Sequence, residues 1–582
     1  MVHAIAIVAV RTRTRVVRPR TRGGANPGDR AGNRDAIVPG PHRPMRVLDS
    51  PSSPSSAIPR VAATFERVAW ALAACVVAIH IALLWRFAVD WPLHDDFTQI
   101  VAMPGYLVQL PTLREKLALL TELALEHRAA TIRLAGWIAA AAPGGMNFLA
   151  LIALGNALAL GAGIVAIFAF PRAYRGAAAL LAALLLTSLT HYAAQYHATG
   201  ALQHFGVAFY ALASLFALSK RYRVVATAFA LAAVFTSGSG LLVLPCAAAL
   251  TWLSGRRKEA AAWAFAGVAV MALYFIGYEG PATRSNLASL VGDPLRASAL
   301  ALAAFGCIGG ELFASLAIGA VAVLVWLGLL GTGAWRRVPP FVIAVSLFFA
   351  LALGVIAAGR ASFGIEAVLL SRYRIGSGLL ALMTVAALSH VLDDGTFKRV
   401  QRSAIACAAA LYAIAFSVVM TSLVDLHVMQ LALRDHFAAD NSGHYDGYRQ
   451  EWGDFTLRRA REIGVYVGER HARPPASVQA ALAVEGPGPR VLHARAYAGT
   501  RVFSVFGLLD GGRRLSVWLR EGERTFRGEL VTLRYPGSRL RMHTALHGTF
   551  STSGVPPGRY QVGFSDDANA GIAWTAHHVE VR

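Results

Sequence analysis

The chain has 582 residues, of which 55% are hydrophobic and only 15% are charged, and its formal net charge is +22. A soluble domain usually carries about 25% charged residues, and several apolar runs here approach the length of about 20 residues that crosses a bilayer. This composition excludes an ordinary soluble enzyme and predicts a mainly α, polytopic helical membrane protein. The positive charge could indicate nucleic-acid binding, but it is concentrated in the N-terminal tail and in short loops between apolar runs. That is the pattern of the positive-inside rule, so we expect no nucleic-acid partner.

The N-terminal residues 1–64 are rich in Arg, Pro, Gly and Ser and show no apolar periodicity, which predicts a disordered basic tail. Met45 is a candidate start of translation, and residues 1–44 would then not belong to the protein. Arg residues recur up to the first apolar run whichever start is used, so the N-terminus is expected in the cytoplasm.

The first span is expected at about 68–88, and the segment that follows it is Asp90–Phe97, with the sequence DWPLHDDF. An Asp at the bilayer centre costs about 2.5–3.5 kcal/mol, so these carboxylates must lie at or beyond the membrane interface. Trp85 and Trp91 are candidate aromatic anchors there. We therefore expect an acidic cluster on the outer side, opposite the N-terminus.

Residues 110–142 combine charges with one side of Leu residues, which predicts a single amphipathic helix lying on the outer membrane surface. Its charged positions include Glu126, His127 and Arg128. A solvated helix in a long loop would show the same pattern, and the sequence does not separate these alternatives.

Three further spans are expected at about 146–170, 176–190 and 201–219. Basic loops follow the first and the third, whereas the loop 191–197 carries His191, Gln195 and His197 but no Lys or Arg, which places it outside.

The next apolar run, 224–254, is interrupted at 236–240 by the sequence TSGSG, which would break a helix. A continuous helix would place Arg256, Arg257 and Lys258 outside. We therefore expect two short helices in a hairpin that keeps these charges inside.

The remaining spans are expected at about 260–278, 299–331, 341–358, 375–392 and 402–424. The run 299–331 is too long for one untilted crossing and contains several Gly residues, so part of it is expected to be a half-helix or a tilted segment. Counting the hairpin as two gives about 11 spans in a membrane domain of residues 65–425, with the C-terminus outside. The protein is expected in the bacterial inner membrane.

The polar C-terminal part is divided at about residue 490. We expect residues 426–489 to form a helical extracytoplasmic linker region. We expect residues 490–582 to form a small β-rich domain that is also extracytoplasmic, that is, periplasmic. Apolar and polar residues alternate in four runs, at 514–519, 530–533, 559–564 and 573–581, with Gly and Pro turns between them. Alternation of this kind is typical of antiparallel strands with one buried face, as in a β-sandwich.

The expected outer face gathers the candidate site residues. The pair Asp95 and Asp96 could hold a divalent cation, Mg²⁺ or Mn²⁺, or take a proton from an attacking hydroxyl, and Arg372 and Arg374 could clamp a phosphate. These two Arg residues depart from the positive-inside rule, and the negative charge of a bound lipid phosphate or pyrophosphate would compensate for theirs. The alternatives are a solvated loop for the Asp pair and snorkelling side chains for the Arg pair. Further candidate substrate-binding residues on this face are Glu126, His127, Arg128, Arg360 and Tyr373.

The order of these features resembles the GT-C superfamily of polytopic glycosyltransferases, in which a span is followed by an acidic residue in the first outer loop and an amphipathic helix. The pieces Glu126-His127-Arg128 and Gly359-Arg360…Phe363-Gly364…Ser371-Arg372-Tyr373 are also similar to a group of bacterial membrane proteins with this layout. The resemblance covers roughly residues 65–425. It implies a catalytic centre at Asp95 and Asp96, a membrane-lipid environment, and a polyprenyl-phosphate-linked sugar as donor.

Three functions are compatible with these features. The preferred one is transfer of a sugar from a polyprenyl-phosphate donor to an envelope glycan, lipid or protein acceptor. A transporter or flippase of envelope precursors predicts ionisable groups within spans and two matching halves, but Glu311 is the main charge inside a run and no repeat is evident. A non-catalytic membrane scaffold predicts that the Asp pair can be replaced without effect.

Overall fold

The computed structural model describes residues 57–124, 127–278, 292–441, 450–466, 471–481, 489–510, 514–536, 542–566 and 571–581. The chain divides into a unit Met1–Phe65 and a much larger unit Glu66–Arg582, which contains all the predicted site residues. The prediction of a disordered basic tail falls on 1–64, of which residues 1–56 lie outside the described residues.

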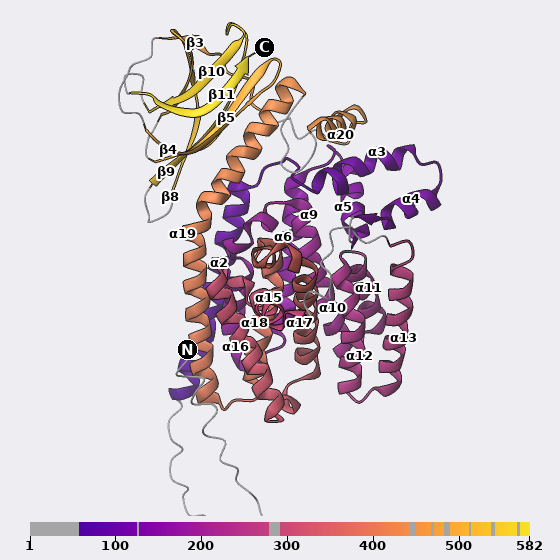
Figure 1. The fold of residues 1–582 in the computed structure, drawn as a ribbon. Coiled ribbons are helices and arrows are strands. Elements are labelled where there is room, and N and C mark those ends of the chain that lie inside the picture. Colours follow the sequence, from indigo (N-terminus) through magenta and orange to yellow (C-terminus); the bar gives the residue numbers. More distant parts are fainter. Residues whose placement is uncertain are drawn as a thin grey trace, which may run out of the picture. The chain divides into compact units, whose positions relative to one another are not determined.

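Seven helices in the described part of the chain are long and apolar enough to cross a membrane, which supports the predicted membrane class (Figure 1). They are Thr64–Phe87, Phe148–Ile167, Arg172–Gln195, Ala198–Ser219, Leu312–Gly331, Pro340–Phe363 and Asp394–Asp440. The largest apolar core lies among α6 (Phe148–Ile167), α7 (Arg175–Leu186), α10 (Gly206–Ser219) and α18 (Arg374–Ser389). Ala and Leu dominate it, because small side chains let membrane helices approach closely.

The connection between α2 (Ala57–Phe87) and α6 is built from short elements. They are η1 (Phe97–Val101), α3 (Ala102–Gln109), α4 (Leu113–Thr121), β1 (Leu123–Ala124), β2 (His127–Arg128) and α5 (Ala130–Ala141). The prediction of one helix over 110–142 is therefore wrong. α4 starts at a capping box of Thr112 and Glu115, and the chain turns away where Arg133 Nη1 donates to the carbonyls of Leu119 and Glu122, at 2.6 and 2.9 Å.

The interruption at 236–240 reverses the chain, as predicted. α11 (Arg223–Val234) and α12 (Val243–Leu253) are separated by the 3-10 turn η5 (Gly238–Leu242). The basic loops before α11 and after α12 meet: Arg256 Nη2 donates to the Leu218 carbonyl at 3.1 Å, and Glu259 bridges Arg223 and Arg256. The two loops therefore lie at the same end of the helices.

Glycines also divide the long run 299–331, part of which was expected to be a half-helix or a tilted segment, into two helices. α15 (Pro294–Phe305) and α16 (Leu312–Gly331) are joined by η6 (Cys307–Gly309). Their backbones touch, because a Cβ added to Gly306 would lie 1.9 Å from the Ser315 carbonyl oxygen and one added to Gly319 would lie 2.0 Å from the Leu302 carbonyl oxygen. Only glycine permits helices to approach this closely.

The remaining helical elements of this part connect or extend the candidate spans. They are η2 (Arg172–Tyr174), η3 (Leu189–His191), α8 (Tyr192–Gln195), α9 (Ala198–Gly200), η4 (Ala201–Phe205), α13 (Arg257–Tyr274), η7 (Ala334–Arg337), α17 (Pro340–Arg360), η8 (Ala361–Phe363), η9 (Ile365–Val368) and η10 (Ser371–Tyr373).

The helix that contains the last predicted span, at about 402–424, extends beyond it at both ends. α19 runs unbroken over 47 residues, Asp394–Asp440, and is about 70 Å long at 1.5 Å per residue. Asp393 caps its start, where the carboxylate accepts a hydrogen bond from the Thr396 amide at 3.0 Å. Residues 426–440, which were expected to begin a separate linker region, therefore continue the same helix. A further helix, α20, covers Gln450–Glu462.

The C-terminal region forms two antiparallel sheets, with the strand orders β11-β10-β6-β7-β3 and β4-β5-β9-β8. The strands are β3 (Gln479–Ala480), β4 (Arg490–Ala498), β5 (Val502–Asp510), β6 (Ser516–Glu521), β7 (Arg524–Glu529), β8 (Val531–Pro536), β9 (Met542–Ser551), β10 (Gly558–Ser565) and β11 (Ala573–Val581). The four predicted runs overlap β6, β8, β10 and β11. Both sheets contribute to one core, which includes Phe503, Leu519 and Phe564.

The four-stranded sheet also packs on α19. Phe506 and Leu508 of β5 share an apolar cluster with Leu423 and Val428 of the helix. A buried hydrogen bond of 2.8 Å joins His436 Nδ1 to Ser504 Oγ. The sheet thus covers a helix face that would otherwise be apolar and exposed.

Candidate functional site

The acidic segment after α2 holds one of its two predicted catalytic carboxylates deep in the protein. Asp96 is 1% exposed, and its Oδ2 accepts a hydrogen bond from the Leu93 amide at 3.0 Å. Its Oδ1 accepts a hydrogen bond from the Thr199 amide at 2.7 Å and lies 3.3 Å from His197 Nε2. The pair joins the first connection to the short segment between the third and fourth candidate spans.

The Asp96–His197 pair is an ion pair by its electrostatics. Burial alone would raise the pKa of Asp96, but His197 and the hydrogen bonds from Thr199 and Leu93 outweigh burial and leave this pKa below its ordinary value. Burial alone would lower the pKa of His197, but the charge of Asp96 outweighs it and raises this pKa above its ordinary value. Both shifts favour a carboxylate beside an imidazolium.

The neighbouring Asp95 is half-exposed, in contrast to Asp96. Its carbonyl accepts hydrogen bonds from Thr98 Oγ1 at 3.1 Å and from the Gln99 amide at 2.8 Å, so the start of η1 fixes its backbone. His94, at φ +42°, is exposed, and its ring lies 5.6 Å from the His197 ring. Asp95 is therefore the carboxylate of the pair that a substrate can reach.

Both segments that supply the ion pair lead into π-helical turns. η1 begins directly after Asp96, and η4 follows His197 and Thr199. π-turns are rare and occur often at functional sites, because they shift side chains out of the regular helical positions.

Further contacts to the acidic segment and to the end of α2 come from the start of α6 and from the C-terminal half of the chain. His427 of α19 has its Nδ1 2.9 Å from the Phe87 carbonyl. The Asp90 carboxylate accepts a hydrogen bond from the Phe148 amide at 2.7 Å, and the Asp90 carbonyl accepts one from Tyr466 at 3.1 Å. Burial raises the pKa of Asp90 in spite of the Phe148 bond.

Arg372, one of the two residues predicted to clamp a phosphate, and Arg360, predicted only to bind substrate, carry guanidinium groups without an anion among the described residues. Arg360 and Arg372 stack on the rings of Phe363 and Tyr373, at 5.7 and 5.3 Å. Neither forms an ion pair or a side-chain hydrogen bond with the described residues, and Arg372 Nε is buried without an acceptor. A buried cationic nitrogen without a partner is costly, so these groups favour an anionic ligand.

His204 in η4 connects the basic groups to the acidic pair. Its ring lies 5.7 Å from the ring of Tyr373, which is itself buried. The charges close enough to act on His204 are those of Arg372, His127, His197 and Arg360. The fold thus gathers residues from β2, the segment before η4, and the connection between α17 and α18.

Two other predicted binding residues, Arg374 and Arg128, donate to main-chain carbonyls. Arg374 bonds to Leu369, Thr190 and Gly310, and Arg128 bonds to Thr121, Tyr274 and Ile276, all at 2.8–3.3 Å. Such arginines fasten loops, and their role in substrate binding stays a prediction. His127 accepts a hydrogen bond from the Gly238 amide at 3.2 Å, so the break at 236–240 orients it. Glu126 lies outside the described residues.

The predicted metal site at Asp95 and Asp96 lacks a third ligand. In the described part of the chain no three His, Cys, Asp or Glu side chains are grouped to hold a metal ion. Both oxygens of Asp96 already accept N–H groups, and Asp95 is the more exposed carboxylate of the two. Metal dependence therefore stays a prediction.

Sequence reasoning gave no role to His204 and named His197 only as part of the loop expected outside. His204 lies in an apolar run, and an ionisable residue inside a candidate span is itself a signal of function. His197 lies 101 positions after Asp96, and no local pattern connects them.

A scan against protein-family models and searches of curated proteins and of solved structures gave no match.

Proposed function

We propose that the protein is a membrane glycosyltransferase that moves a sugar from a polyprenyl-phosphate donor to a hydroxyl of an envelope glycan, lipid or protein. The observation that carries this proposal is that an acidic group of residues and a basic group of residues meet around His204. On one side the buried Asp96–His197 pair holds the half-exposed Asp95. On the other side Arg360 and Arg372 have no anionic partner among the described residues. Transfer from a phosphate needs both a base at the acceptor and cations at the leaving group.

In the proposed reaction Asp95 takes the proton of the acceptor hydroxyl while that oxygen bonds to the anomeric carbon of the sugar. The bond between the anomeric carbon and the phosphate oxygen breaks, and polyprenyl phosphate leaves with its charge stabilised by Arg360 and Arg372. Asp96 is a positioning residue, since its hydrogen bonds fix the turn that carries Asp95. The proton on Asp95 afterwards passes to solvent.

A divalent cation, Mg²⁺ or Mn²⁺, is a separate part of the proposal. Mg²⁺ is commonly held by one or two carboxylates together with substrate phosphates, and Asp95 offers one such carboxylate. The proton transfer described above does not require the ion. Activity measured with and without EDTA decides this point.

We place this site on the extracytoplasmic face of the bacterial inner membrane, with a cytoplasmic N-terminus, about 11 crossings, and the C-terminal sheets as a periplasmic sandwich. Two observations support this placement. The basic loops around Arg223 and Arg256 lie together at one end of the bundle. The acidic segment lies at the opposite end of the bundle, next to the start of α6, where the Phe148 amide donates a hydrogen bond to Asp90.

The test is sugar transfer by the full-length protein in reconstituted vesicles that contain polyprenyl-phosphate-linked sugars. Asp95→Asn keeps the shape of the side chain but removes the base, and we expect kcat to fall by about a hundredfold or more. Arg372→Ala is expected to raise KM for the donor, because its partner is the phosphate of the bound ground state.

The control is Asp394→Asn, which removes an exposed carboxylate at the other end of α19 and should leave transfer unchanged. If Asp95→Asn retains wild-type transfer and envelope glycan composition, Asp95 belongs to a solvated loop. A scaffold function would then replace the enzyme.

A further inference from the structure

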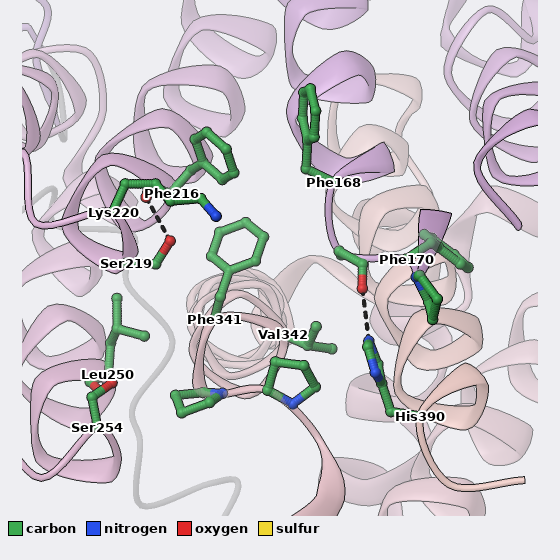
Figure 2. Close-up of a pocket in the computed structure, with 14 residues that line it drawn as sticks. Phe168, Phe170, Phe216, Ser219, Lys220, Leu250, Ser254, Phe341, Val342 and His390 are labelled. Atoms are coloured by element: carbon green, nitrogen blue, oxygen red, sulfur yellow. Dashed lines mark hydrogen bonds between the residues drawn. The ribbon is translucent and has the colours of Figure 1, made fainter. Parts of the chain in front are cut away.

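A cavity of about 490 Å³ lies where several helices of the bundle begin or end, and Figure 2 shows the side chains that line it. Phe168 directly follows α6, Ser219 ends α10, and Phe341 belongs to the first turn of α17, so three candidate spans end at its wall. α6 has 20 residues, which places the cavity about 30 Å along that helix from the acidic segment. When these helices cross a bilayer, lipid headgroups surround this end of the bundle.

One part of the cavity wall is aromatic and apolar. The ring of Phe216 lies 5.4 Å from that of Phe168 and 5.7 Å from that of Phe341. Pro339 and Pro340, which have no amide hydrogen, continue this surface. Such a wall favours the hydrocarbon part of a ligand.

The cavity wall also includes one cation, the exposed Lys220, which has no acidic neighbour among the described lining residues. Lys220 directs its ammonium group towards Phe216 and Phe341, with Nζ 5.5 Å from the centroid of the Phe216 ring (Figure 2). In the described part of the chain it has no ion pair and no side-chain hydrogen bond. None of the fourteen described lining residues is acidic.

The other polar groups at the wall are already bonded within the protein. Ser219 and Ser254 donate their hydroxyl hydrogens to carbonyls of their own helices, at 2.6 and 2.7 Å. His390 Nε2 lies 2.9 Å from the Ala169 carbonyl, as the dashed line in Figure 2 marks. The Leu218 carbonyl near the end of α10 is taken by Arg256. Lys220 therefore remains as the strong donor, and the positive end of the α17 dipole points to the same space.

We propose that this cavity binds the phosphate of an anionic phospholipid. Lys220 donates a charge-assisted hydrogen bond to the phosphate, and the first methylenes of the lipid lie against Phe168, Phe216 and Phe341. The proposal does not depend on the proposed transferase activity, because none of these residues takes part in it.

A phospholipid suits the cavity better than a free phosphate ion does. A small dianion keeps its hydration unless several donors replace the water, and the cavity offers one ammonium group. A phosphodiester carries a single charge and brings its own apolar part, which matches one cation beside an aromatic wall.

The experiment is native mass spectrometry of the detergent-purified full-length protein, titrated with phosphatidylglycerol or phosphatidylcholine of the same acyl chains. Phosphatidylglycerol should bind about tenfold more tightly or better, because both lipids carry the phosphate but only phosphatidylcholine adds a cationic choline group, which neutralises the headgroup and is repelled by Lys220. Lys220→Gln should abolish this preference, and Lys220→Arg should keep it. Ser254→Trp, which fills the cavity from an exposed position, should weaken binding with Lys220 intact.

The matched control is Arg257→Gln, which removes an equal charge from the same end of the bundle, where Arg257 stacks on Trp252 outside the cavity. It should leave the preference unchanged. Equal binding of the two lipids, or equal losses in Lys220→Gln and Arg257→Gln, would overturn the proposal. Displacement of phosphatidylglycerol by millimolar inorganic phosphate would do so as well, since the cavity would then be a site for free anions.

Discussion

Asp95 and Asp96 are adjacent, but the turn into η1 sends one carboxylate inward and leaves the other half-exposed. The sequence predicts that the pair is important, since two acidic residues beside a span must be accommodated at the interface. It does not predict which of them is buried, because that depends on His197 and the Thr199 amide, far along the chain. The basic partners could be predicted in part: Arg372 and Arg360 have no anionic partner in the described part of the chain, whereas Arg374 fastens a loop.

The ion pair predicts a pH window for stability. The pKa of Asp96 is lowered in the folded state, so its contribution is present above the ordinary value of 3.8 and is lost as pH falls through the lowered pKa. The pKa of His197 is raised, so its contribution is fully present below 6.5 and is lost as pH rises through the raised pKa. Stabilisation by the pair is therefore largest between these limits.

We expect thermal unfolding of the detergent-purified protein to shift to lower temperature as pH rises through the raised pKa of His197. His197→Gln should cost about 3–5 kcal/mol at neutral pH, because Asp96 would be buried without its counter-charge, and should flatten this alkaline decline. His578→Gln, at an exposed strand position, is the control. An unchanged alkaline decline in His197→Gln would show that another group is responsible.

At the scale of elements, apolar runs predict membrane helices well, because a helix that faces lipid or other helices needs about 20 such residues whatever its neighbours are. Breaks at Gly-rich positions were also predictable, at 236–240 and 306–310. β5, one of the strands that these runs did not predict, shows the limit of such patterns. All but one of its nine residues are buried, since one face lies in the sheet core and the other on α19, so alternation is absent.

The close contact of α15 and α16 predicts a position-specific effect of adding a methyl group. Gly306→Ala places a Cβ 1.9 Å from a backbone oxygen that cannot move aside alone, and we expect a destabilisation of about 1–3 kcal/mol or more. Gly328→Ala lies on α16 with nothing within 4 Å, and it should be neutral or slightly stabilising. Thermal unfolding in one detergent compares the two. Equal effects of the two substitutions would mean that α15 and α16 can move apart without a loss of stability.

At the scale of the whole molecule, the C-terminal sheets are not independent of the membrane helices. β3 and the bridge between Ala476 and Phe550 lie before the boundary predicted at 490. Phe506 and Leu508 on the outer face of β5 are buried only because α19 covers them.

A fragment of residues 471–582 should therefore fold but associate with itself through this face. We expect an antiparallel-sheet circular dichroism spectrum together with a dimer or larger species by light scattering. Replacing Leu508 with Thr should shift the fragment towards the monomer, whereas Leu492→Thr, at an already exposed position, should not. A spectrum of an unfolded chain would contradict the assignment of these sheets as a folding unit.

Because α19 is uninterrupted, it fixes how the four-stranded sheet is rotated about the helix axis relative to the acidic segment. His427 meets the Phe87 carbonyl, and His436, nine residues and two and a half turns later, meets Ser504. Each residue of an α-helix turns the chain by about 100°. Inserting one residue between these two histidines would turn His436 by about 100° about the helix axis relative to His427. One of the two contacts would then be lost, although the insertion adds only about 1.5 Å of length. The spacing of the two histidines, more than their identity, is therefore what aligns the sheet with the turn that carries Asp95.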